Sequence, residues 1–153
     1  MNLLHFIAVR LPRCSKHPFV RRSAFVCKGS VLPASCVIGE RVKIKGHEGR
    51  LPVFGESVFV NDDSVIWGDV KIGCGVKIHQ KCFVSDCGYS EKGFSYEPVV
   101  IGDYVIVEAH SIICKGVKIG NAATVLAGSV VTQSVPSMAI VSGNPARIVE
   151  VKQ

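Results

Sequence analysis

Aliphatic residues recur at every sixth position over most of this chain. In the last third the series runs Ile101, Val107, Ile113, Ile119, Val125 and Val131, and a small or β-branched residue follows each of them four places later. An α-helix repeats its buried face every 3.6 residues and a strand every two. A period of six is therefore neither, and it predicts a repeat architecture.

The same period occurs in two earlier runs, which begin at Val20 and Val60. Six residues have room for one short strand and one corner, so three repeats close a triangular coil, and about sixteen repeats give about five stacked coils. Companion positions four residues later, such as Ser64, Gly88 and Ser129, are also expected to point inward. The other residues expected inside these two runs are Val26, Leu32, Ile38, Ile44, Ile66, Ile72, Ile78 and Val84.

The composition agrees with this architecture. Of 153 residues, 48% are hydrophobic but only 7% aromatic, which suits one all-β domain with a narrow aliphatic core. The net charge of +6 indicates an anionic partner, for which the phosphates of a cofactor would suffice; no nucleic-acid partner is expected. The seven cysteines show no C-x-x-C spacing, which favours free thiols in a reducing cytoplasm.

The N-terminal segment 1–19 is expected to cap one open end of the stack. Its apolar start, Met1–Val9, is too short to span a bilayer, and basic residues follow it rather than precede it, unlike a signal peptide. A membrane-surface anchor is the alternative, although membrane contact is not the expectation.

Two breaks in the six-residue phase divide the rest of the chain. Extra residues lie near Gly46–Arg50, and the polar, Gly-bearing segment 85–98 is expected to leave the stack at a corner as a loop. The β-helix is thus expected over 20–135, with a C-terminal tail over 136–153. Because loops on rigid scaffolds often carry sites, both breaks are candidate functional regions.

The segments Ile119–Pro136 and Gly143–Arg147, together with the repeated [Ile/Val]-Gly-x-x-[small] pattern, resemble the hexapeptide-repeat acyltransferases. The closing Gly-Asn-Pro-Ala-Arg points to the maltose/galactoside and polysaccharide O-acetyltransferase branch. The resemblance implies a left-handed parallel β-helix, a homotrimer, acetyl-coenzyme A bound between neighbouring protomers, and acetyl transfer to a hydroxyl or amine.

Transfer of an acyl group from a thioester to a hydroxyl needs a base for the hydroxyl proton. The resembling enzymes carry a histidine for this on the corner loop, but segment 85–98 contains none. His79 and His110 are therefore the catalytic candidates; the alternative for each is a polar corner residue at a subunit contact. Cys87 as a nucleophile has no sequence-adjacent histidine to support it. The histidine spacing of a zinc site is also absent, so no metal is expected.

The expected coenzyme site rests on the late repeats. The resemblance places the pantetheine arm near Ala109, Ala127, Gly128 and Ser129, and Gly143-Asn144-Pro145 is expected to turn the tail back along the stack. Cations for the phosphates are Lys115, Lys118, Arg147 and Lys152, unless they form only a solvated basic face.

The sequence thus predicts a cytoplasmic, trimeric O-acyltransferase that uses acetyl-coenzyme A and modifies a sugar or polysaccharide-precursor hydroxyl. The alternative is a non-catalytic β-helix scaffold or binding module that has lost the loop histidine.

Overall fold

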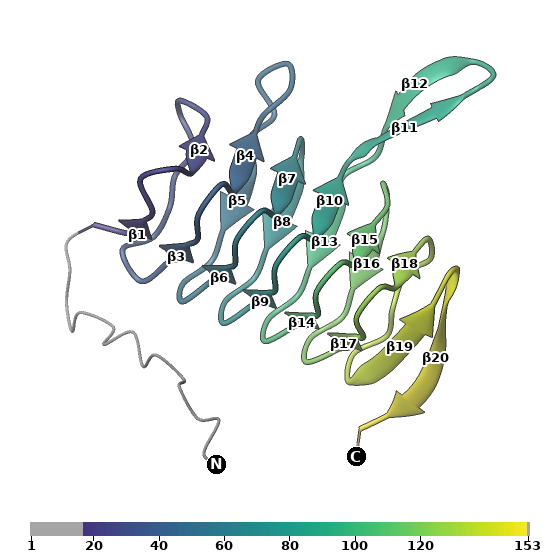
Figure 1. The fold of residues 1–153 in the computed structure, drawn as a ribbon. Helices are drawn as coiled ribbons and strands as arrows, with labels where there is room; N and C mark the ends of the chain where they lie inside the picture. Colours follow the sequence, from purple (N-terminus) through teal and green to yellow (C-terminus); the bar gives the residue numbers. More distant parts are fainter. Residues whose placement is uncertain (1–16, 153) are drawn as a thin grey trace, which may run out of the picture.

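The computed structural model describes residues 17–152, and every regular element in that range is a β-strand. Short strands wind around a common axis in triangular coils and form a left-handed parallel β-helix (Figure 1). The segment expected to cap the N-terminal end lies almost wholly outside the described residues.

Three sheets form the faces of the prism. Face 1 contains, in spatial order, β1 (Phe19–Val20), β3 (Val37–Ile38), β6 (Phe59–Val60), β9 (Lys77–Ile78), β14 (Ile106–Val107), β17 (Thr124–Val125), β19 (Ala139–Gly143) and β20 (Ala146–Val151). Face 2 contains β18 (Val130–Val131), β15 (Ile112–Ile113), β10 (Phe83–Ser85), β7 (Val65–Trp67), β4 (Lys43–Lys45) and β2 (Phe25–Val26). Face 3 contains β16 (Lys118–Ile119), β13 (Val99–Ile101), β8 (Val70–Ile72) and β5 (Val53–Phe54).

Neighbouring coils pair in parallel and in register, so that equivalent positions stack. Val84, for example, lies between Ile66 and Ile113. Strands β1 to β19 of face 1 show about seven coils rather than the five counted from the repeats. The additional sides include Phe54, six residues before Val60, together with Val135 and Val141, of which Val141 lies in the segment expected as a tail.

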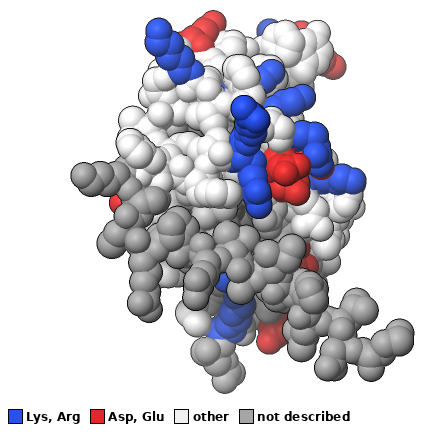
Figure 2. Space-filling model, turned by 60° about the vertical axis from the view of Figure 1, so that its left-hand side comes forward, with Lys and Arg blue, Asp and Glu red and all other residues white. Residues whose placement is uncertain are grey.

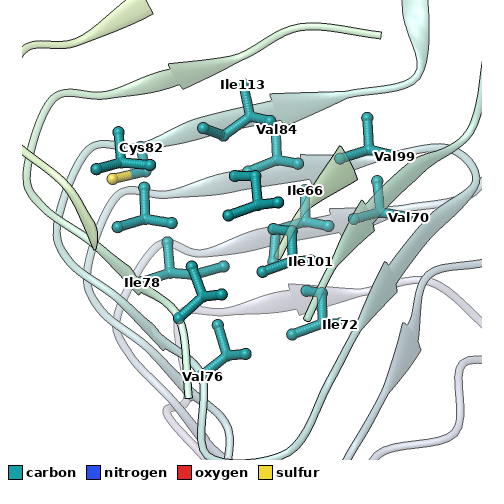
Figure 3. Packing of buried hydrophobic residues seen from close by; sticks show 14 of the residues in the cluster. Ile66, Val70, Ile72, Val76, Ile78, Cys82, Val84, Val99, Ile101 and Ile113 are labelled. Atoms are coloured by element: carbon teal, nitrogen blue, oxygen red, sulfur yellow. The ribbon is translucent and has the colours of Figure 1, made fainter. Parts of the chain in front are cut away.

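The core is a column of aliphatic side chains along the prism axis. Figure 3 shows residues from all three faces, among them Ile66, Ile78 and Ile101, converging on this axis. All the inward residues expected between Ile101 and Val131 are at most 2% exposed, which confirms the expected column. Burial of this kind contributes about 25 cal/mol per Å² of apolar surface and is the main stabilising term of the fold.

Two inward expectations are wrong. Val20 in the first coil is 38% exposed, because no described coil covers the N-terminal end of the column. Gly88 lies in strand β11 (Cys87–Ser90), which pairs antiparallel with β12 (Gly93–Tyr96) in a hairpin outside the prism. Figure 1 shows this hairpin projecting beyond the coils.

The corners determine where side chains can form a site. We number them by the faces they join: corner 1 joins face 1 to face 2, corner 2 joins face 2 to face 3, and corner 3 joins face 3 back to face 1. Corner 3 shows why glycine recurs in the repeat, since a Cβ added at Gly73 would lie 2.7 Å from the carbonyl carbon of Gly102 in the next coil. Close stacking of the coils therefore requires the missing side chain.

Candidate functional site

Corner 1 is a stacked column in which most coils adopt the same turn. Its third residue has a positive φ in five successive coils, and backbone N–H groups donate to the coil before, as from His110 to Gln80 at 3.1 Å and from Gly128 to Ala109 at 2.9 Å. The five residues with positive φ are Arg41, Asp63, Lys81, His110 and Gly128. The column is thus rigid and presents the third side chain of each coil outward.

Both candidate histidines lie on corner 1, in neighbouring coils. His79 is half-buried at the first corner position, where its backbone N–H donates to Val107 O at 2.8 Å. His110 is exposed at the third position. In the stack, His110 follows Lys81 rather than His79. The structure therefore brings the histidines to one edge of the prism but staggers them along the turn.

The small residues expected to contact coenzyme A share this edge. Ala109 stacks below Ala127, and Gly128, for which no atom lies within 4 Å of an added Cβ, leaves open space beside the backbone. Glu108 closes the corner by accepting a hydrogen bond from Ala127 N–H at 3.0 Å. An exposed strip of backbone with little side-chain cover results.

The Gly143-Asn144-Pro145 turn continues the same edge. It joins β19 to β20, which pair antiparallel, and it contains a cis Asn144–Pro145 peptide bond. Arg147 pairs with Ser142 across this hairpin and is exposed. The closing motif therefore sets one cation near the end of corner 1.

Three of the expected phosphate cations, Lys115, Lys118 and Lys152, lie apart from this strip; the Lys152 ammonium group donates to Ala122 O at 2.9 Å and to Thr124 Oγ1 at 2.7 Å. Lys115 is at corner 2, where its ammonium group pairs with the Glu97 carboxylate, and Lys118 points outward on face 3. Ser129 is completely buried, and its hydroxyl donates to Leu126 O at 2.5 Å. Its side chain closes the turn, so Ser129 can offer a ligand little besides its backbone.

Corner 2 carries both insertions that interrupt the repeat. The first is a tight turn in which His47 and Arg50 exchange backbone hydrogen bonds of 2.9 Å, with positive φ at Glu48 and Gly49 between them. The second is the β11–β12 hairpin, whose root pairs Cys87 with Tyr96. Two chain segments that are far apart in sequence are therefore neighbours here.

His47 and Tyr96 join the two insertions. Their rings stack with centroids 4.7 Å apart and an interplanar angle of 20°, and Tyr96 Oη lies 3.4 Å from His47 Nε2. Sequence reasoning missed this pair. The phase break at Gly46–Arg50 located the turn, but no sequence signal showed that it meets the hairpin.

Asp86 lies beneath the root of the hairpin and is completely buried. Its Oδ2 accepts a hydrogen bond from Asp69 N–H at 2.8 Å, while Oδ1 has no hydrogen-bond partner among the described residues. Gly68 makes room for it, since an added Cβ would lie 1.9 Å from Oδ1. This carboxylate therefore links the root of the hairpin to the corner of the preceding coil.

Positive charge is not confined to corner 1. Figure 2, which brings the N-terminal coils forward, shows more Lys and Arg than Asp and Glu surface. Exposed cations of these coils include Arg21, Arg22, Lys28 and Lys43. Net charge alone therefore does not locate the coenzyme site.

Among residues 17–152, no three His, Cys, Asp or Glu side chains are grouped so that they could hold a metal ion. The cysteines in the same range are free thiols, and burial raises the pKa of Cys36, Cys82 and Cys114. This part of the chain also contains no helix long and apolar enough to cross a membrane.

Comparison with known proteins gives no matching family model but several similar enzymes. The chain is 45% identical to a 2,3,4,5-tetrahydropyridine-2,6-dicarboxylate N-acetyltransferase of Staphylococcus aureus over 56 residues. The matched segment is 37% of this chain but only 23% of that enzyme. A hexapeptide-repeat acetyltransferase from Vibrio cholerae, solved with acetyl-coenzyme A, superposes with a TM-score of 0.71 at 25% identity, covering 86% of this chain and 72% of that one. A maltose O-acetyltransferase from Clostridium difficile gives 0.65 at 26% identity, covering 76% and 70%.

These similarities confirm the resemblance to the hexapeptide-repeat acyltransferases, including the maltose O-acetyltransferase branch. The chain shares their stacked-coil architecture over most of its length.

Proposed function

We propose that this protein is an acyltransferase that moves the acetyl group of acetyl-coenzyme A to a hydroxyl of a sugar or polysaccharide precursor. The observation that carries the proposal is the exposed backbone strip of corner 1, ending at Arg147, in a chain similar to an acetyltransferase solved with acetyl-coenzyme A. The similarity to a maltose O-acetyltransferase supports a saccharide acceptor.

In this proposal the pantetheine arm lies along Ala109, Ala127 and Gly128. Small side chains let an extended ligand approach the backbone closely. Asn144 and Arg147 stand at the end of the strip, where a guanidinium can form charge-assisted hydrogen bonds to phosphate. Lys115 is at corner 2 and Lys118 on face 3 of the protomer, so they reach the same coenzyme only if it lies between protomers.

The base candidates on this edge are His79 and His110. A neutral imidazole within reach of the acceptor hydroxyl would take its proton as the oxygen attacks the thioester. His110 is exposed and the better placed for contact with a ligand, whereas His79 is half-buried.

We also propose a homotrimer in the cytoplasm. The outward side chains of face 2 form a column that is apolar except at Lys43, and in it Phe83 and Ile112 are each 40% exposed and pair in register. Neighbouring protomers can cover such a column by closed symmetry. Corners 1 and 2 lie at opposite edges of face 2, so a trimer would bring corner 1 of one protomer to corner 2 of the next.

The test is acetyl-coenzyme A consumption, followed as thiol release with a panel of mono- and disaccharides, nucleotide sugars and amino sugars. Transfer to a hydroxyl acceptor is expected, and mass spectrometry of the product distinguishes an ester from an amide. Tight coenzyme binding without transfer to any acceptor would instead support a non-catalytic scaffold.

A further inference from the structure

The turn that carries His47 has a backbone fixed by its conformation and hydrogen bonds. Positive φ at both Glu48 and Gly49 defines the tight two-residue connection that suits the twist of a hairpin. The hydrogen bonds between His47 and Arg50 close the turn on both sides. The turn fixes the backbone at His47, and its ring then stacks on Tyr96.

The groups around His47 are those that a proton acceptor needs. Its Nε2 faces Tyr96 Oη at 3.4 Å, and its Nδ1 lies 3.9 Å from the Glu48 carboxylate. The Tyr96–His47 distance is long for a hydrogen bond, but catalytic hydrogen bonds often shorten only when substrate is bound. The Arg50 guanidinium lies over the Tyr96 ring, 6.0 Å from its centroid. One carboxylate and one guanidinium therefore lie beside the pair.

Resting on the proposed acyl transfer, we propose that Tyr96 and His47 form a proton relay that replaces the histidine missing from the corner loop. Tyr96 is the catalytic residue that touches the acceptor hydroxyl, and His47 is the positioning residue that accepts the proton through it. The relay lies at corner 2, which a trimer would set against the coenzyme edge of the next protomer.

The step balances without any further reactant. The acceptor oxygen forms a bond to the thioester carbonyl carbon while its proton passes to Tyr96 Oη and the Tyr96 proton passes to His47 Nε2. The tetrahedral intermediate then breaks its C–S bond and expels the coenzyme A thiolate. The proton returns from His47 through Tyr96 to the sulfur.

The electrostatics explain why two residues are needed. Burial, with added repulsion from Cys87 and Glu48, raises the pKa of Tyr96. The phenol therefore stays neutral and cannot act as a base unless a neighbour takes its proton. The ionisable groups that face this pair are Glu48, Arg50, Cys87 and the buried Asp86. Protonation of His47 would remove the acceptor, so turnover should fall on the acid side.

Tyr96→Phe is the decisive variant because it keeps the ring that stacks on His47 and removes only the hydroxyl. We expect kcat to fall by roughly 10² to 10⁴-fold, the usual cost of losing a general base. Tyr104→Phe, an exposed tyrosine at corner 3, is the matched control and should retain full activity. Thermal unfolding of each variant shows that the fold is unchanged.

His47→Gln tests the positioning role. The amide fills the space of the ring but cannot accept a proton from a phenol at neutral pH, so kcat should fall and the acid side of the pH–kcat profile should flatten. Loss of activity with an unchanged pH profile would assign His47 a structural role and overturn the relay.

Two further outcomes separate this inference from the proposed function. An active wild type in which Tyr96→Phe is equally active, while His110→Gln or His79→Gln is not, would overturn the relay alone. A wild type that binds acetyl-coenzyme A yet acetylates no acceptor would overturn the relay and the proposed function together.

Discussion

The Arg41 guanidinium donates two hydrogen bonds to the Asp63 carboxylate of the next coil, from Nε to Oδ1 at 2.6 Å and from Nη2 to Oδ2 at 2.8 Å. Both residues occupy the third position of corner 1, where φ is positive. Because the coils stack in register, a side chain at one corner position meets the equivalent side chain of the neighbouring coil. Corner 1 can therefore link coils through charge, in addition to the apolar column inside.

Asp63→Asn should lower the thermal midpoint slightly at pH 7, since exposed ion pairs contribute little. The hydrogen bonds from Arg41 lower the pKa of Asp63 in the folded state. The stabilisation is therefore present above the ordinary aspartate pKa and is lost as the pH falls through the lower folded value. Differential scanning calorimetry from pH 7 down to about pH 2 should show the thermal midpoints of wild type and variant converging. Glu91→Gln at the exposed hairpin turn is the control, and a gap that persisted in acid would contradict this reading.

Gly68→Ala should destabilise the protein by more than the roughly 1 kcal/mol that a left-handed conformation costs a non-glycine residue. Gly68 has φ +85°, and an added Cβ would collide with the buried Asp86 carboxylate. Gly93→Ala is the matched control, because φ is +100° there and no atom lies within 4 Å of an added Cβ. Urea unfolding gives the loss in the free energy of unfolding for each variant. Equal losses would mean that the Asp86 side chain moves aside freely.

The period of six identified the column inside the prism because burial acts at every repeat, as at Ile78, Ile101 and Ile113. The period also located both insertions, since each disturbs the phase. It did not predict that the column continues to Val141, within the segment expected as a tail. Nor could the period predict the contact between His47 and Tyr96, because this contact depends on two insertions that leave the same corner two coils apart. The roles expected of His79, His110 and the coenzyme residues stay predictions.

Arg147→Ala should weaken coenzyme A binding at least tenfold, because a hydrogen bond to a charged group contributes about 1.5–3 kcal/mol. Isothermal titration calorimetry at low and moderate salt measures the loss, which should shrink as salt screens the phosphates. Lys28→Ala, on an exposed turn of the first coils, is the matched loss of a cation and should bind normally. Equal weakening in both variants would indicate a general charge effect instead of a phosphate contact.

Phe83→Asp should dissociate the proposed trimer. Phe83 is 40% exposed at the middle of the apolar column on face 2, and a charge there would have to be buried on assembly. Light scattering should give about three times 16.4 kDa for wild type and the mass of one chain for the variant. Lys71→Asp on face 3 makes a larger change of charge and should leave the mass unaltered. A wild type that is monomeric at micromolar concentration would contradict the proposed assembly.

Co-expression of two inactive variants tests whether each site is shared between protomers. Gly128→Trp should block the coenzyme strip at corner 1, and Tyr96→Phe should remove the relay at corner 2. Either variant alone should be nearly inactive. In randomly mixed trimers about a quarter of the sites would combine an intact corner 1 from one protomer with an intact corner 2 from its neighbour, so about a quarter of wild-type activity should return. The two purified proteins, mixed without subunit exchange, should remain inactive and serve as the control. If each protomer held a complete site by itself, co-expression would restore nothing, because every protomer would still carry one damaged corner.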